Sequence, residues 1–190
     1  MLKNRYWLLL LFTVFLISCN QRENNKIPIV DYNLLITERI QKITEDNDHT
    51  ELQNQKVYWG NDTVNIYMLS DFVAQQILFF YFSENTCSPC VEQSINIISK
   101  YIPDYLTTNQ VVFMSPDCIP RFRENRYGKR LLGLENKELG IQLEEESVPF
   151  FFTINGEMKI NDLHIVNKND FEKTSEYLNY LTSKFKFTNI

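Results

Sequence analysis

Two cysteines separated by two residues, Cys87 and Cys90, have the types and spacing that most directly suggest chemistry in this 190-residue chain. Such a pair can act as a redox dithiol, can supply half of a four-ligand zinc site, or can form an inert structural bridge. Redox exchange would need one exposed, acidic thiol that attacks as the thiolate and a second thiol that resolves the mixed disulfide. The pair alone leaves all three interpretations open.

The residues around the pair predict a helix that begins at the first cysteine. Residues 77–82 form a short unbroken apolar run, which is typical of a strand covered on both faces. After Cys87, apolar residues recur at helical spacing until Pro103; these are Val91, Ile95, Ile98 and Ile102. Free N–H groups and the helix dipole stabilise negative charge at a helix start, so we expect the pKa of the Cys87 thiol to be below that of free cysteine. Cys90, one turn inside the helix, should be buried and less ionised.

The remaining sequence predicts an alternation of strands and helices. Residues 110–115 form the next buried strand, and the helix between the two strands implies a right-handed crossover with parallel pairing. Four further elements are predicted from periodicity and turn residues. They are a helix from Asp31 to about Thr44, a β-hairpin over 56–69, a helix over 120–131, and a strand over 148–154 that turns at Asn155-Gly156 into a second strand. An amphipathic helix over 169–185 completes the chain.

This order of elements resembles the thioredoxin fold. Residues 77–90, ILFFYFSENTCSPC, parallel the family's apolar strand, short loop and dithiol, and residues 148–157, VPFFFTINGE, parallel its proline-bearing strand and hairpin. The leading hairpin and the turn LSDF resemble those of envelope-exported lipoprotein and periplasmic thiol–disulfide oxidoreductases. The resemblance covers roughly residues 55–187. It implies an α/β thioredoxin fold, with a central mixed β-sheet flanked by helices and an N-terminal β-hairpin.

The resemblance also implies roles for individual residues. Cys87 would be the attacking cysteine and Cys90 the resolving one. Pro149 corresponds to a proline that the family holds in the cis form beside the dithiol. Val148, directly before it, would pair its backbone with an incoming peptide. The resemblance implies neither a cofactor nor a metal.

The sequence departs from the family at two positions near the dithiol. Many thioredoxins carry a buried acid six residues before the first cysteine, where this chain has Tyr81. Thioredoxin's tryptophan directly before that cysteine is replaced by Thr86. Proton transfer to and from the resolving thiol would then fall to Glu84, to Glu92 or to water, although such carboxylates are more often solvated surface charges.

Cys118, a basic run and two histidines are the other residues that could take part in chemistry or binding. Cys118 follows the strand 110–115, whose carboxyl end meets the same sheet edge as that of 77–82, so it is either a spare thiol or a third redox partner. A basic run is expected to be the solvated face of a helix rather than a lipid or acidic-partner site; its members are Arg121, Arg123, Arg126, Lys129 and Arg130. His49 and His164 have no ligand spacing and are expected to be loop and strand histidines.

The first eighteen residues have the layout of a secretory signal, with two basic residues before an apolar run. They end at LISC, residues 16–19, which resembles the lipobox of bacterial lipoproteins, so Cys19 is predicted to carry the lipid rather than to be incidental. We expect a signal peptide at 1–18, a lipid-anchored tether and helix at 19–54, and a thioredoxin-like domain at 55–190. Cleavage removes two basic residues and no acids, so the formal net charge of −5 becomes −7. That balance disfavours nucleic-acid binding.

Three functions compete at this stage. The first is a lipid-anchored thiol–disulfide oxidoreductase of the cell envelope that reduces disulfide-bonded envelope proteins and is reloaded by a membrane electron donor. The second is a peroxiredoxin-like peroxidase, although the usual Thr-x-x-Cys pattern is absent because Thr86 directly precedes Cys87. The third is a non-catalytic or metal-binding module, in which zinc would need both cysteines, Cys118 and a histidine.

Overall fold

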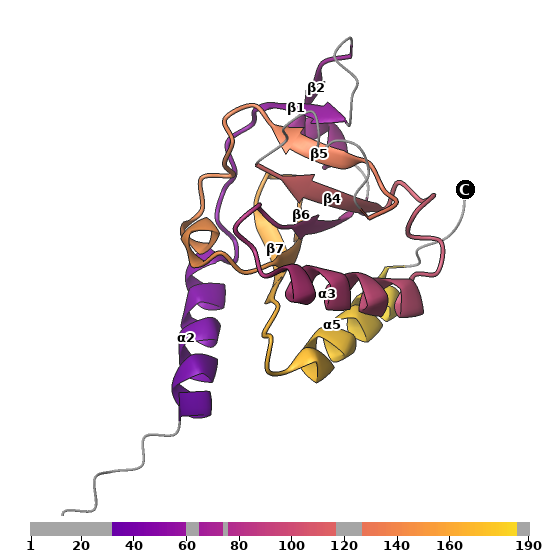
Figure 1. Cartoon of the computed structure of the whole chain (residues 1–190). Coiled ribbons are helices and arrows are strands. Elements are labelled where there is room, and N and C mark those ends of the chain that lie inside the picture. The colour runs from indigo at the N-terminus through magenta and orange to yellow at the C-terminus, as the bar shows by residue number, and fades with distance from the viewer. Residues whose placement is uncertain (1–31, 60–64, 74–75, 117–126, 186–190) are drawn as a thin grey trace, which may run out of the picture. The chain divides into compact units, whose positions relative to one another are not determined.

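The computed structural model describes residues 32–59, 65–73, 76–116 and 127–185 (Figure 1). The chain divides into two units, Met1–Ile36 and Thr37–Ile190, and only the start of a helix is described in the first. In chain order the elements are α2 (Tyr32–Asn47), β1 (Lys56–Trp59), β2 (Tyr67–Met68), η1 (Leu69–Phe72), β3 (Leu78–Tyr81), α3 (Ser88–Tyr101), β4 (Val111–Ser115), β5 (Leu131–Leu134), η2 (Gln142–Glu146), β6 (Phe150–Ile154), β7 (Ile160–Ile165) and α5 (Phe171–Lys184). Within the described ranges, no helix has both the length and the apolar character needed to cross a membrane.

The strands form one mixed sheet in the order β2-β1-β5-β4-β3-β6-β7. β3 and β4 are parallel, which confirms the predicted β-α-β crossover through α3. β1 pairs with β2, and β6 with β7, in the antiparallel sense, which confirms both predicted hairpins. β6 also pairs antiparallel with β3. This order and these directions, with α3 and α5 in their places along the chain, are those of the thioredoxin fold.

One predicted element is wrong where the structure can be compared with it. Residues 117–126 of the helix predicted for 120–131 lie outside the described residues, but from Tyr127 onward the chain is not helical. Gly128 has a φ of 81°, a left-handed conformation that ends any helix there. Leu131–Leu134 instead form β5, parallel to β4 and antiparallel to β1. This segment is a strand because it pairs with β1 on one side and β4 on the other. Its apolar run is too short to predict that pairing from the sequence.

The core lies on both faces of the sheet. Successive side chains of a strand point to opposite faces, so alternate residues of β3, β4 and β6 enter two separate apolar clusters. α3 and α5 lie side by side over one face (Figure 1), where Ile98 and Leu178 are fully buried. The other cluster takes Leu69 of η1, Leu143 of η2 and Ile43 of α2.

Aromatic pairs join β3, which leads to the dithiol, to β6, which follows Pro149. The ring centroids are 5.1 Å apart in Phe79–Phe152, 4.5 Å in Phe80–Phe151 and 4.6 Å in Tyr81–Phe150. These pairs coincide with the strand register. Aromatic pairs of this kind contribute about 0.5–1.5 kcal/mol each beyond area burial. The ladder therefore fixes the register between the two strands that border the candidate site.

Candidate functional site at the dithiol

Cys87 and Cys90 form a disulfide at the start of α3, with their Cα atoms 5.2 Å apart. Cys87 is the N-cap residue, and its Sγ accepts a hydrogen bond from the Cys90 N–H at 3.3 Å. Its carbonyl accepts from the Val91 N–H at 3.1 Å. When the pair is reduced, the same N–H and the helix dipole would favour a thiolate at Cys87.

The two sulfurs differ in exposure. Cys90 is only 4% exposed, which confirms its predicted burial, whereas Cys87 is half-buried. Ser94 of the next turn packs in the buried layer and donates its hydroxyl to the Cys90 carbonyl at 2.8 Å. A large substrate can therefore reach Cys87 more readily than Cys90.

The loop between β3 and Cys87 is held by Thr86. Its Oγ1 accepts from the Ser83 N–H at 2.9 Å, and its own N–H donates to the Ser83 carbonyl at 3.1 Å. Thr86 is 7% exposed. At the loop's start, the Phe82 N–H donates to the Met114 carbonyl at 3.1 Å and so extends the pairing with β4. The residue that replaces thioredoxin's tryptophan thus closes the turn that presents the cysteines.

The position of the missing buried acid is filled by a tyrosine that contacts an acid from elsewhere in the chain. The Tyr81 hydroxyl donates to Oε1 of Glu144 in η2. The same carboxylate accepts backbone N–H groups from Leu139 at 2.9 Å, Gly140 at 2.9 Å and Ile141 at 3.2 Å. Glu144 was not singled out from the sequence. Glu144 is three residues after Ile141, the N-cap residue of η2. A glutamate at this position is typical of a capping box, and this was the available signal.

A cavity of about 540 Å³ adjoins these residues. Tyr81, Ser83 and Asn85 line it on the side of the dithiol loop, and Pro116 lines it after β4. The opposite wall is the segment 137–147. The cavity therefore lies at the carboxyl edge of the parallel strands, the same edge from which the chain enters the Cys87 loop.

The predicted cis geometry of Pro149 is wrong, because no peptide bond among the described residues is cis. Ser147, directly after η2, has a φ of 52°, and this left-handed residue turns the chain into β6 with a trans bond at Pro149. Val148 is half-buried against the core, and the Pro149 carbonyl accepts from the Val166 N–H at 3.0 Å. The trans bond removes the geometry on which peptide pairing by Val148 was expected. That pairing remains only a prediction from resemblance.

The other predicted site residues fall into two groups. Glu84 in the dithiol loop and Glu92 on α3 are both exposed, and a proton relay through either stays a prediction. Cys118 and Cys19 lie outside the described residues, as do the basic residues of 121–126.

Lys129 contradicts the prediction of a solvated helical face. It is 6% exposed, and its Nζ donates to the carbonyls of Tyr105 at 2.6 Å and Thr108 at 2.7 Å. Burial lowers the pKa of Lys129 to about 8, while Asp104 opposes this effect. These two hydrogen bonds from the Lys129 ammonium stabilise the loop that follows α3. Its neighbour Arg130 is exposed.

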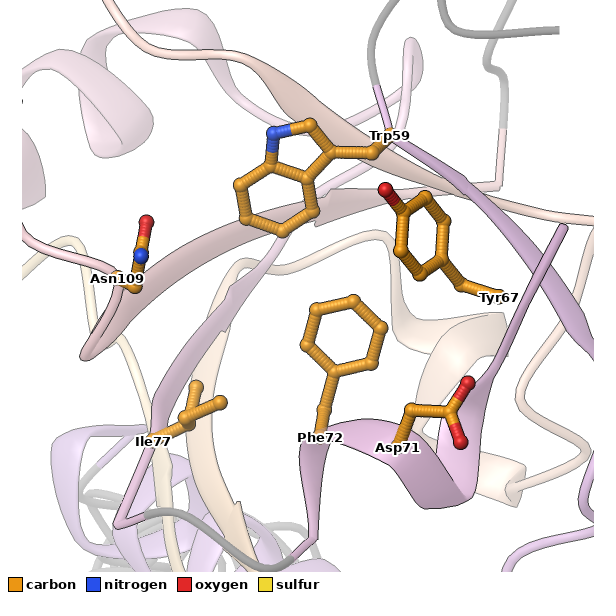
Figure 2. Close-up of a pocket in the computed structure, with 6 residues that line it drawn as sticks. All are labelled: Trp59, Tyr67, Asp71, Phe72, Ile77 and Asn109. Atoms are coloured by element: carbon orange, nitrogen blue, oxygen red, sulfur yellow. The ribbon is translucent and has the colours of Figure 1, made fainter. Parts of the chain in front are cut away.

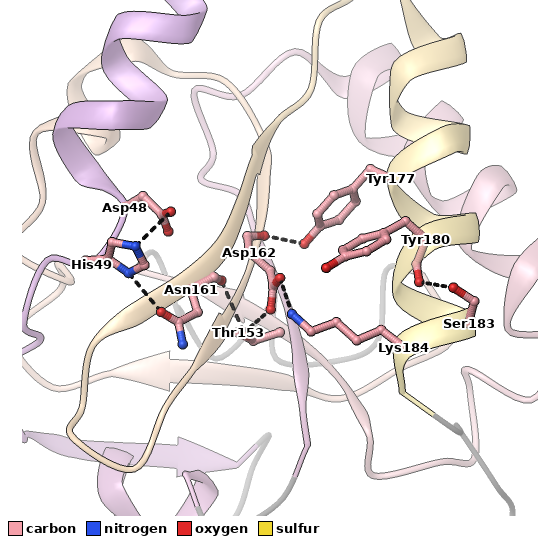
Figure 3. A network of polar contacts seen from close by, with 9 residues as sticks. All are labelled: Asp48, His49, Thr153, Asn161, Asp162, Tyr177, Tyr180, Ser183 and Lys184. Carbon is pink, nitrogen blue, oxygen red and sulfur yellow. Dashed lines mark hydrogen bonds and ion pairs between the residues drawn. The ribbon is translucent and has the colours of Figure 1, made fainter.

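His164 lies half-buried on strand β7, which confirms the prediction of a strand histidine. It stacks on Tyr177 of α5 with centroids 4.6 Å apart and shares a hydrogen bond with Thr174 at 3.0 Å. Burial lowers the pKa of His164 to about 4, so the ring is neutral at pH 7. Nearby, the Tyr177 hydroxyl donates to the Asp162 carbonyl at 2.6 Å, and Lys184 donates to the Asp162 carboxylate at 2.6 Å (Figure 3). We name this group the β7–α5 corner.

His49 is a loop histidine that contacts Asn161 Oδ1 at 3.0 Å (Figure 3). Within the ranges that the structure describes, no group of three or more His, Cys, Asp and Glu side chains is placed to hold a metal ion.

A second cavity, of about 350 Å³, lies at the other edge of the sheet (Figure 2). Trp59 stacks on Phe72 with centroids 5.7 Å apart, and Tyr67 meets the same ring edge-on at 6.3 Å. Asp71 of η1 also lines the cavity, as do Ile77 and Asn109, which come just before β3 and β4. Since the dithiol follows the opposite ends of these strands, the two cavities are separate.

Comparison with known proteins gives similarity of structure only. No protein-family model matches the chain, and no curated protein matches its sequence. Peroxidoxin BcpB from Mycobacterium tuberculosis is similar at 13% identity and a TM-score of 0.45, over 71% of this chain and 97% of that one. A variant of PrxQ from Xylella fastidiosa is similar at 15% identity and a TM-score of 0.43, over 73% and 95%. A protein from Bacteroides thetaiotaomicron, assigned provisionally as a protein disulfide isomerase, is similar at 14% identity and a TM-score of 0.43, over 72% and 89%.

At these scores, the fold assignment rests on the chain's own strand order and directions. Together the fold and the site define a thioredoxin-fold protein with a Cys-x-x-Cys disulfide at a helix start. A thiol redox function is what this pair supports.

Proposed function

We propose that this protein is a thiol–disulfide oxidoreductase that reduces protein disulfides in the cell envelope. The observation that carries the proposal is the Cys87–Cys90 disulfide at the start of α3, with Cys87 half-buried and Cys90 buried. Unequal access gives the two sulfurs unequal roles, because an incoming disulfide contacts the more accessible one. The substrates would be disulfide-bonded envelope proteins.

The first exchange step starts from the reduced pair. The Cys87 thiolate attacks one sulfur of the substrate disulfide, which forms a bond between Cys87 and that sulfur. The substrate's own S–S bond breaks, and its second sulfur leaves as a thiolate that takes up a proton. The first-turn N–H on the Cys87 sulfur supports the thiolate before this attack.

The second step releases the substrate. Cys90 loses its proton and attacks the Cys87 sulfur, so that the Cys87–Cys90 bond forms and the second substrate thiolate leaves. Two electrons have then passed from the protein to the substrate, and two protons end on the substrate thiols. A membrane electron donor would reduce the protein's disulfide again and so reset the cycle.

Insulin reduction with dithiothreitol as the electron source tests the redox part. The wild-type domain should accelerate insulin precipitation, and Cys87→Ser should abolish the acceleration. Cys118→Ser should leave the rate intact if Cys118 is a spare thiol and should slow it if Cys118 is a third redox partner. Peroxide consumption without insulin reduction would favour the peroxidase, and stoichiometric zinc in the purified protein would favour a metal-binding module.

Membrane attachment is the second part of the proposal, and it rests on the sequence LISC at residues 16–19. Several acyl chains on Cys19 would hold the protein firmly, since each buried methylene contributes about 0.8 kcal/mol. Wild-type protein expressed in its own host should partition into detergent, whereas Cys19→Ser should remain in the aqueous phase. Equal partitioning of the two would remove the anchor from the proposal without touching the redox part.

A further inference from the structure

Tyr81 and Glu144 join the strand before the dithiol to the far wall of the adjoining cavity. Tyr81 is the last residue of β3 and is 3% exposed. Glu144 lies in η2, whose segment forms the opposite wall. Their hydrogen bond therefore spans from the strand that enters the dithiol loop to a segment more than sixty residues later in the chain.

Glu144 sets the conformation of its own segment. Its carboxylate accepts the consecutive N–H groups of Leu139, Gly140 and Ile141 in addition to the tyrosine hydroxyl. Gly140 has a φ of 81°, and a left-handed residue within such a run lets successive N–H groups converge on one anion. One side chain thus gathers four donors, and the shape of the wall depends on it.

Tyr81 connects this carboxylate to both borders of the site. Its backbone continues into the loop that Ser83 and Thr86 close, directly before Cys87. Its ring stacks on Phe150 at 4.6 Å, next to Pro149. A displacement of Glu144 would therefore move the wall relative to the dithiol loop, while the stacked strands would stay in register.

We propose that Glu144 is a positioning residue for the thiol–disulfide exchange proposed above, on which this inference rests. Held by Tyr81, it keeps the segment 139–147 in place as the wall of a cavity that seats the polypeptide flanking a substrate's disulfide. Glu144 does not touch the reacting sulfurs, so the exchange steps and their electron balance are unchanged. A protein substrate needs the wall, whereas a small disulfide needs only the Cys87 sulfur.

The test compares two substrates in single turnovers of the prereduced full chain. Oxidised insulin is the protein disulfide, and hydroxyethyl disulfide is the small one. Acid quenching and alkylation follow the loss of protein thiols, and the concentration dependence gives a half-saturating concentration and a maximal rate. Glu144→Ala should raise the half-saturating insulin concentration about threefold to tenfold, the range that lost hydrogen bonds produce. Its rate with hydroxyethyl disulfide should equal that of the wild type.

Conservative variants separate positioning from charge and from folding. Glu144→Gln retains one oxygen for the backbone N–H groups and should show a smaller effect than Glu144→Ala. Tyr81→Phe keeps the ring on Phe150 and removes only the hydroxyl. Because Glu144→Ala already removes the hydrogen bond to Tyr81, combining Tyr81→Phe with Glu144→Ala should add nothing to Glu144→Ala alone. If Glu144→Ala does not fold, the Gln and Phe variants carry the test.

A matched control exists at another tyrosine–glutamate contact. The Tyr58 hydroxyl donates to Glu135 at 3.2 Å, and neither residue lines the cavity. Glu135→Ala and Tyr58→Phe should leave the rate and the half-saturating concentration unchanged with both substrates. An unchanged insulin concentration dependence in Glu144→Ala, or equal slowing with both disulfides, would overturn the inference. A wild-type protein that exchanges with neither disulfide would instead contradict the proposed function itself.

Discussion

The dithiol edge of the sheet and the β7–α5 corner both bury polar groups, but they differ in what those groups can reach. At the dithiol edge, Cys87 remains half-buried, and Ser83 and Asn85 of the loop before it line a cavity of about 540 Å³. At the corner, His164 is enclosed by Tyr177 and hydrogen-bonded to Thr174, which is fully buried. Histidine is usually the side chain best suited to proton transfer near neutral pH. Here the surroundings of His164 keep it neutral and give it a structural role. The cysteines are then the residues of these two regions that are suited to chemistry.

In these two regions, solvent access and neighbouring groups determine the role of a residue more than its type does. Burial lowers the pKa of His164 to about 4, which removes its charge at neutral pH. Burial likewise raises the pKa of Tyr177 well above its ordinary value. By contrast, the Cys87 sulfur contacts a donor N–H at a helix start, where negative charge is favoured. Four experiments test whether the two regions differ in this way.

The largest effect is expected from the two cysteines, whose roles should be all-or-none. In Cys90→Ser, the mixed disulfide on Cys87 loses its intramolecular exit, so covalent complexes with envelope proteins should accumulate and dissolve on reduction. Cys87→Ser should give none, because Cys90 is buried. Non-reducing gels with mass spectrometry of the trapped bands measure this. Symmetric outcomes for the two variants would end the oxidoreductase proposal.

The second effect concerns stability at acid pH and belongs to the corner. The pKa of His164 is about 4 in the folded protein and about 6.5 when the chain is unfolded, so only the unfolded state takes up the proton between these values. Stability should be unaffected above pH 6.5 and should fall by roughly 2–3 kcal/mol as the pH drops toward 4.

Urea unfolding of the wild type and His164→Gln at several pH values checks this expectation. The difference in the free energy of unfolding between the two proteins should shrink as the pH falls. The unfolded wild type is stabilised by binding a proton at His164, and the variant has no such group. His49→Gln, at an exposed loop position, is the control and should follow the wild type. A constant difference between wild type and His164→Gln across this range would contradict the structural role assigned to the His164 ring.

The third effect is the acidity of the reduced Cys87 thiol. The helix start should bring its pKa below the value of about 8.5 for free cysteine. The rate of alkylation by iodoacetamide as a function of pH measures this value, with Cys90→Ser and Cys118→Ser combined so that one domain thiol remains. A pKa at or above that of free cysteine, with the helix intact, would leave Cys87 without an activating environment.

The smallest effect comes from a matched pair of threonines, one in each region. Thr86→Val loses the bond from the Ser83 N–H, and Thr174→Val loses the bond to His164. Each change should cost about 1 kcal/mol of stability, since each leaves a half-buried partner without this hydrogen bond. Only Thr86→Val should also slow insulin reduction. If Thr174→Val slows it equally, the two regions are coupled and the comparison fails.

Most of the fold followed from local patterns because those patterns have local causes. The unbroken apolar run before the dithiol, the helical spacing after Cys87 and the Asn155-Gly156 turn each predicted an element that the structure contains. β5 was missed because LLGL is too short to show a period, and its strand character comes from partners in β1 and β4. Lys129 was misplaced for a related reason, since the carbonyls that bind it belong to another loop.

Neighbouring residues alone predicted the spacing of the dithiol, its place at a helix start and most of the strands and helices, with β5 as the exception. The tertiary structure decided which side chains meet across the sheet edge. It placed Glu144 within hydrogen-bonding distance of Tyr81 and left the Pro149 peptide bond trans after the left-handed Ser147. It also lowered the pKa of His164 by burial, so that the ring is neutral at pH 7. Contacts between distant segments set these features, because burial and hydrogen bonding depend on packing that no short stretch of residues contains.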